Sequence, residues 1–123
     1  MLNNHTLVAF VATTDGARAR SFYSEVLGLE LVSDDGFAIV FDANGTRLRI
    51  QKVEDVLPHR YTALGWHVPD IEAVVRGLRA RGVSFDIYEG LQQDALSIWT
   101  SPSGAKIAWF KDPDGNVLSL SQF

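Results

Sequence analysis

The sequence predicts an α+β domain built from two similar modules, each with one helix and one curved, mixed sheet. Strand-like and helix-like segments follow the same order in both halves of the chain. The residues that begin and end the two helical segments, Asp15 and Asp70, Gly28 and Gly82, recur 54 or 55 positions apart. With 123 residues, 46% of them hydrophobic, the chain can bury a core unaided. We expect one domain over residues 1–123, with an internal repeat of about 5–53 and 61–123.

The first half begins with an apolar, β-branched segment that ends at an Asp-Gly turn, which is typical of a buried strand, residues 5–13. A helix is expected over 15–28, because apolar residues recur at helical spacing. Asp15 can cap its start, and Gly28 suits a left-handed C-terminal cap. Asp-Gly and Asn-Gly turn signals then separate three predicted strands, at 29–34, 37–45 and 46–53.

The same order returns after a polar linker, residues 54–61. A strand is predicted at 62–68, followed by a helix over 69–82 that Pro69 and Asp70 open. The remaining predicted strands are 83–88, 95–101, 105–111 and 116–123. Each module is therefore a βαβββ-like unit. Packing one helix on the outer face of each sheet leaves the other two sheet faces to form a cup.

The turn between the last two strands fixes which side chains share a face. Its sequence, DPDG, matches a three-residue hairpin loop in which a type I turn is followed by a left-handed glycine. This loop pairs Trp109 with Ser119 on the cup face, and Phe110 with Leu118 on the helix face. A two-residue loop would reverse the two faces.

Alternation along the other strands completes the expected ligand-binding surface. It is mostly apolar with a few polar anchors, which is typical of small-molecule pockets. Its residues are Val8, Phe10, Arg49, Gln51, Ala63, Gly65, His67, Trp99, Trp109 and Ser119.

Composition argues against several other classes of function. Eleven basic residues are outnumbered by fifteen acidic ones, for a net charge of −4, so a nucleic-acid partner is not expected. The chain has no cysteine, which excludes disulfides, thiolate zinc sites and cysteine nucleophiles and fits a reducing compartment. No apolar run approaches the roughly 18 to 20 residues of a membrane span. We therefore expect a cytoplasmic protein with no membrane partner.

Two stretches resemble signatures of the vicinal-oxygen-chelate superfamily, the paired βαβββ fold of glyoxalase I, extradiol dioxygenases and bleomycin-resistance proteins. SFYSEVLGLEL, residues 21–31, is similar to the family's first-helix signature, and FKDPDGNVLSL, residues 110–120, to its closing signature. The resemblance extends from about Leu7 to Leu120. It implies a glyoxalase-like fold and a homodimer, in which each cup is formed either within one chain or by exchange of modules.

The resemblance also implies where a divalent metal would be held in the family's enzymes. The four corresponding positions here are Val8, Arg49 or else Gln51, Ala63 and Ser119. A catalytic metal site needs about three imidazole or carboxylate donors. None of these side chains supplies one, so we expect no metal ion and no other cofactor.

The leading hypothesis is a metal-independent protein that binds a small organic ligand, anionic or aromatic, similar in kind to the bleomycin-resistance and antibiotic-binding branch. Arg49 would contact an anionic group, and Trp99 and Trp109 would form aromatic walls. No catalytic residue is assigned. The alternative is a lyase or isomerase related to glyoxalase, either metal-free through His67 and Arg49 or with unconventional metal ligands. A third possibility is a regulatory or dimeric scaffold without a ligand.

Overall fold

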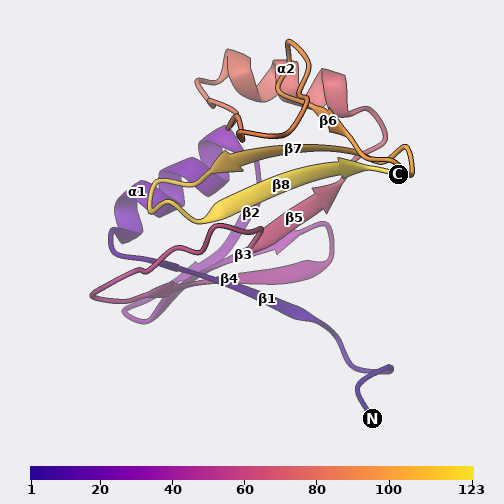
Figure 1. Cartoon of the computed structure of the whole chain (residues 1–123). Helices are drawn as coiled ribbons and strands as arrows, with labels where there is room; N and C mark the ends of the chain where they lie inside the picture. The colour runs from indigo at the N-terminus through magenta and orange to yellow at the C-terminus, as the bar shows by residue number, and fades with distance from the viewer. The chain divides into compact units, whose positions relative to one another are not determined.

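The computed structural model describes residues 1–123 and divides into two compact units, Met1–Leu57 and Pro58–Phe123. Each unit contains one four-stranded mixed sheet and one helical segment (Figure 1). The predicted α+β class and its two βαβββ modules are therefore confirmed. Neither helix has the length and apolar character needed to cross a membrane.

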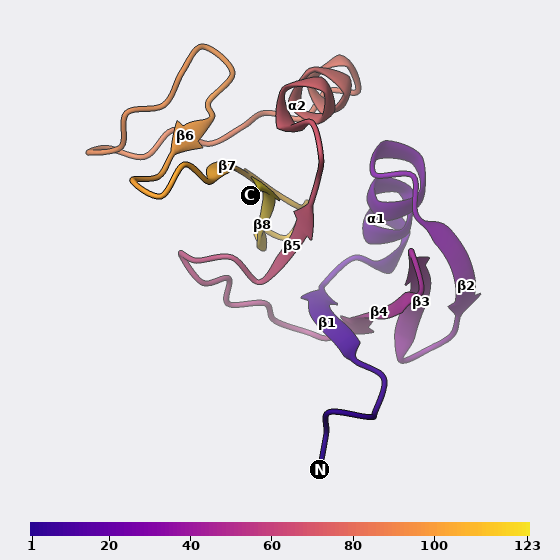
Figure 2. The same ribbon diagram turned by 90° about the vertical axis from the view of Figure 1, so that its right-hand side faces the viewer.

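The first unit follows the predicted order of elements. These are β1 (Val8–Thr13), α1 (Gly16–Ser21), a π-helical turn η1 (Phe22–Val26), β2 (Glu30–Asp34), β3 (Ala38–Ala43) and β4 (Thr46–Lys52). The sheet order is β1-β4-β3-β2, with β1 parallel to β4 and the other pairs antiparallel. Helix α1 packs on β3, as Figure 2 shows.

The predicted helix over 15–28 is present, but in two segments with different windings. The Asp15 side chain caps α1 by accepting a hydrogen bond from the Arg18 amide at 3.1 Å. The wider turn η1 follows, and its Tyr23 is fully buried, with its ring centroid 6.1 Å from that of Phe41. Gly28 then adopts a φ of 76°, the left-handed conformation that its sequence position predicts.

The second unit repeats this plan. It consists of β5 (Leu64–His67), α2 (Ile71–Ala80), β6 (Trp99–Thr100), β7 (Lys106–Lys111) and β8 (Val117–Gln122). The sheet order is β5-β8-β7-β6, with β5 parallel to β8. Asp70 caps α2 by accepting from the Ala73 amide at 3.1 Å, and α2 packs on β7 and β8 (Figure 2).

The predicted strand at 83–88 is wrong, and the one at 95–101 is mostly so. The first makes a single bridge, Phe85 to Phe110, and the second is reduced to Trp99–Thr100. Side chains satisfy the backbone groups that a strand ladder would otherwise bind. Gln93 accepts from the Tyr88 amide and donates to two carbonyl oxygens, and Asp94 accepts from the amides of residues 96 and 98.

The β7–β8 hairpin has the predicted three-residue loop and register. Trp109 pairs with Ser119 and Phe110 with Leu118, and Gly115 has a φ of 87°. Phe110 and Leu118 are fully buried on the side where α2 packs. The loop length thus places Trp109 and Ser119 on the opposite face of the sheet.

Candidate ligand-binding site

In the first unit, the four predicted ligand-binding residues lie together on the sheet face away from α1. Parallel pairing of β1 with β4 sets Phe10 beside Arg49, with Val8 and Gln51 at neighbouring positions of the same face. Leu48 and Ile50 alternate with them and are fully buried. The Phe10 side chain is 51% exposed. This face therefore combines an exposed aromatic ring with a guanidinium group.

Arg49 is a cation that forms no hydrogen bond or ion pair with an acidic side chain of this unit. Lys52 and Arg20 both pair with Asp34, at 2.7 and 3.0 Å, and these contacts hold the pKa of Asp34 below its ordinary value. Arg49 makes no hydrogen bond or ion pair. Its charge contributes only a minor part of the lowered pKa of Asp35, which arises mainly from the amides of Phe37 and Ala38. The Arg49 guanidinium is thus available for an anionic ligand.

In the second unit, the sheet register also brings the predicted residues onto one face. Gly65, Ser119 and Trp109 form one row across β5, β8 and β7. His67 and Trp99 belong to the next row, and Ala63 precedes β5, where its amide donates to the Val117 carbonyl at 2.8 Å. The ring centroids of Trp99 and Trp109 are 6.1 Å apart. All six predicted residues of this unit therefore lie along the face away from α2.

The part of this face next to Trp109 is made of small residues in close contact. A Cβ atom on Gly65 would come within 2.9 Å of the Ser119 Oγ atom. The Thr62 hydroxyl donates to the same Oγ at 3.1 Å, and Ser119 is only 5% exposed. No histidine or carboxylate contacts this hydroxyl, so Ser119 lacks the base that a nucleophilic serine requires.

The aromatic surface is larger than the sequence indicated, because Tyr88 meets the Trp109 ring edge to face at 5.4 Å. A hollow of about 370 Å³ borders these two rings and is lined by Arg60, Tyr61, Thr62, Tyr88, Leu91 and Trp109. A second hollow, of about 330 Å³, is lined by Pro58, His59, Arg60, Tyr88, Lys111, Gly115 and Val117. The two adjoin, since they share Arg60 and Tyr88.

Sequence reasoning missed Tyr88 and Arg60 because it assigned them to a strand and to a linker. One signal could have identified Tyr88. Gly90 marks a turn just beyond it, which places Tyr88 at the end of its segment, where a ring is exposed to a pocket. No comparable signal marks Arg60.

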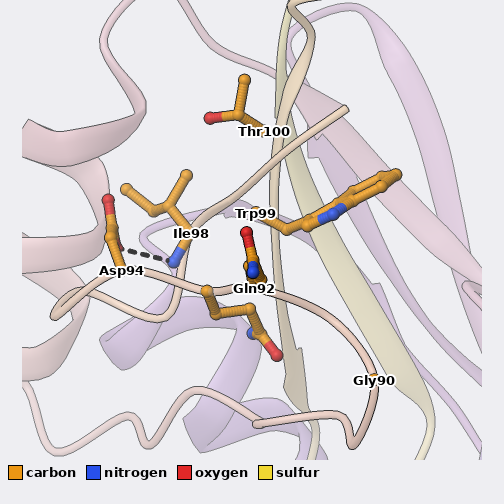
Figure 3. A pocket seen from close by; sticks show the side chains of 7 residues that line it. Gly90, Gln92, Asp94, Ile98, Trp99 and Thr100 are labelled. Atoms are coloured by element: carbon orange, nitrogen blue, oxygen red, sulfur yellow. Dashed lines mark hydrogen bonds between the residues drawn. The ribbon is translucent and has the colours of Figure 1, made fainter. Parts of the chain in front are cut away.

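A third hollow, of about 450 Å³, lies beside β6 and is more polar (Figure 3). Its lining residues are Gly90, Gln92, Gln93, Asp94, Ile98, Trp99 and Thr100. Asp94 accepts from the Ile98 amide at 2.9 Å, so its carboxylate is engaged in holding the loop. The Trp99 ring points away from Asp94 and Ile98 (Figure 3). Trp99 thus borders this hollow while its ring lies near Trp109.

His67 is exposed at the end of β5, where its ring lies 5.2 Å from that of Phe123. It makes no hydrogen bond to a carboxylate or hydroxyl that would orient it for proton transfer. The structure therefore gives His67 an aromatic neighbour but no partner typical of an acid–base catalyst.

The four positions that hold a metal in related enzymes do not fit one here. Val8 and Ala63 offer only alkyl groups, Ser119 offers a neutral hydroxyl, and Arg49 carries a positive charge that would repel a divalent cation. No three His, Asp or Glu side chains are grouped as metal ligands. These residues therefore do not provide the metal site that the family resemblance implies.

Comparison with known proteins identifies the family. The model of the Glyoxalase/Bleomycin resistance protein/Dioxygenase superfamily matches residues 4–120. No curated protein sequence matches the chain.

Solved structures with this fold include a member of that superfamily from Sphaerobacter thermophilus, with 24% identity, a TM-score of 0.78 and full coverage of both chains. TnmS3, an antibiotic binding protein from Streptomyces sp. CB03234, has 26% identity and a TM-score of 0.72 over 99% of this chain and 98% of its own. Lactoylglutathione lyase from Agrobacterium tumefaciens has 15% identity and a TM-score of 0.75 over 98% and 95%. With the family model matching nearly its whole length, the chain belongs to the Glyoxalase/Bleomycin resistance protein/Dioxygenase superfamily.

Proposed function

We propose that this protein binds a small aromatic ligand without a metal ion, on the second sheet's face away from α2. The observation that carries the proposal is the cluster of three aromatic rings beside a floor of small residues. The ring centroids of Tyr88 and Trp99 lie 5.4 and 6.1 Å from that of Trp109, and Gly65 and Ser119 lie in the same row of the sheet as Trp109.

Stacking explains why this surface suits a planar ligand. Aromatic pairs prefer offset or edge-to-face arrangements with centroids 4.5 to 7 Å apart, and such pairs contribute about 0.5 to 1.5 kcal/mol beyond their buried area. Gly65 and Ser119, beside Trp109 on the sheet, project little or no side chain toward a ring placed there. The hydroxyl of Thr62, which lines the same hollow, offers a polar contact that can orient the ligand.

Three further observations favour binding over catalysis. The four metal positions carry no metal donor, and Ser119 and His67 lack the partners that would activate them. TnmS3, a neighbour at 26% identity, is an antibiotic binding protein, which supports a binding role for this chain. The lyase neighbour at 15% identity shares the fold, so it adds no support for an enzymatic reaction.

We also propose that Val8, Phe10, Arg49 and Gln51 bind ligand and that the protein is a homodimer. Their support is the exposed Phe10 ring, the unpartnered Arg49 guanidinium and the family resemblance. Light scattering after gel filtration would measure the dimer directly.

The test is calorimetric titration with a panel of bicyclic aromatic compounds, comparing the wild type with Trp109→Leu and Trp66→Leu. Trp66 is the matched control, because it lies on the opposite face of β5, paired with Leu120. We expect Trp109→Leu to weaken binding about tenfold, and Trp66→Leu to leave the affinity unchanged. Binding that is unaffected by Trp109→Leu, or no binding by any panel member, would contradict the proposal.

A further inference from the structure

We propose that Arg60 binds the anionic group of the ligand, so that the preferred ligand class is an aromatic carboxylate. Its ring would lie on Trp109 and its carboxylate would contact the Arg60 guanidinium. This inference rests on the proposed function, since it takes the Trp109 surface as the place of the ring.

Arg60 occupies the junction between an aromatic and a basic hollow. The hollow that contains Trp109 and the one that contains Lys111 and His59 share only Arg60 and Tyr88. No Asp or Glu lines either hollow, although the chain as a whole carries a net charge of −4. Asp86 lies just outside this lining, where it pairs with Lys111 and interacts with Tyr88, so the Arg60 guanidinium is the charge left unpaired, and it favours an anionic ligand over a cationic one.

Lys111 and Arg60 are the two cations that line these hollows, and Arg60 is the one that forms no ion pair with a carboxylate. The Lys111 Nζ atom lies 2.8 Å from Asp86 Oδ2, and this contact raises the pKa of Lys111. Lys111 thus stays protonated but paired. Arg60 makes no hydrogen bond or ion pair, so its five donors are free, and a planar guanidinium can hold both carboxylate oxygens at once.

The backbone around Arg60 is fixed on both sides. Before it, Pro58 packs so closely on the β7–β8 turn that a Cβ atom at Gly115 would lie 3.3 Å from Pro58 Cγ. After it, Thr62 bonds to Ser119 at 3.1 Å. The rings of His59 and Tyr61, its two neighbours in sequence, stack with centroids 4.9 Å apart. Ligand binding therefore costs less conformational entropy at Arg60 than it would at an arginine in a mobile linker.

The experiment compares two probes of the same shape, naphthalene-2-carboxylate and naphthalene-2-carboxamide, by calorimetric titration of the full chain. Because Arg60 is exposed, we expect the wild type to prefer the carboxylate by about three- to tenfold. In Arg60→Gln this preference should disappear while affinity for the carboxamide stays the same, and Arg60→Lys should keep part of it. Arg76→Gln removes an exposed charge from α2 and is the matched control; it should keep the wild-type preference.

The outcomes distinguish the Arg60 contact from the proposed binding of an aromatic ring at Trp109. If both probes bind equally well to the wild type, or if Arg60→Gln retains the preference, the Arg60 contact is wrong and aromatic binding stands. If neither probe binds at millimolar concentration, both the Arg60 contact and the proposed binding of bicyclic aromatic ligands are contradicted. Circular dichroism spectra of the variants would confirm that each is folded.

Discussion

Gly65 and Ser119 lie opposite each other on β5 and β8, and the space that a side chain at residue 65 would fill is occupied by the Ser119 hydroxyl. The separation from an added Cβ to Ser119 Oγ would be 2.9 Å, and to the Ser119 carbonyl oxygen 3.4 Å. Thr62 holds that hydroxyl in place by a hydrogen bond of 3.1 Å. The pair therefore determines how closely β5 approaches β8 beside Trp109.

The first prediction concerns this pair. Gly65→Ala should destabilise the protein by about 1 to 2 kcal/mol, because the clash with Ser119 outweighs the lower entropy cost of alanine in a strand. In a Ser119→Ala background the same substitution should be close to neutral. Urea unfolding of the four proteins in a double-mutant cycle would measure the coupling. Equal costs in both backgrounds would mean that the Ser119 hydroxyl is not the obstacle.

The second prediction concerns acid stability in the first unit. Lys52 and Arg20 lower the pKa of Asp34 below its ordinary 3.8, so their stabilising contribution is present above the unfolded-state pKa and is lost as pH falls through the lower folded-state value. Asp34→Asn should therefore lower the melting temperature at neutral pH and make progressively less difference as the pH falls below the unfolded-state pKa and through the lower folded-state pKa.

Thermal unfolding of the wild type and Asp34→Asn, followed by circular dichroism at neutral and at acid pH, would test this prediction. Asp55→Asn is the control, since Asp55 is exposed and makes no hydrogen bond or ion pair. A difference between the wild type and Asp34→Asn that is the same at both pH values would contradict the assignment.

The third prediction concerns metal content. Because Val8, Arg49, Ala63 and Ser119 offer no metal donor, protein purified without chelator should contain no stoichiometric divalent ion, and chelator should leave binding of the aromatic probes unchanged. Elemental analysis by mass spectrometry measures this. One divalent ion per chain, released by substitution of His67, would show that unconventional ligands hold a metal.

The parts of the fold that the sequence predicted depend on short-range rules. Asp15 and Asp70 cap their helices because their side chains reach amides three residues on, and the DPDG turn fixes the pairing of Trp109 with Ser119 by its loop length alone. Alternation then assigns each remaining strand residue to a face, which is why the predicted binding residues of each unit lie on one face.

The missed features depend on longer-range contacts. Hydrogen bonds from the side chains of Gln93 and Asp94 replace a strand ladder with an irregular loop. The pattern of apolar and polar residues in the sequence does not indicate these hydrogen bonds. That loop carries Tyr88 to Trp109. Arg60 reaches the same place because Pro58 packs on Gly115, a contact between residues far apart in the chain. In the sequence, the turn signal at Gly90 is the one local indication for Tyr88, and no local pattern marks Arg60.

The β7–β8 turn also limits how this protein can vary. Asp112 accepts hydrogen bonds from the amides of Asp114 and Asn116, at 3.0 and 2.9 Å, and from the Asn116 side chain at 2.8 Å, which fixes the number of residues that the turn contains. A one-residue slip in the pairing of these two strands would place Phe110 instead of Trp109 opposite Ser119. Substitutions on the sheet faces leave this register unchanged, whereas a change in the length of this turn alters which side chains share a face.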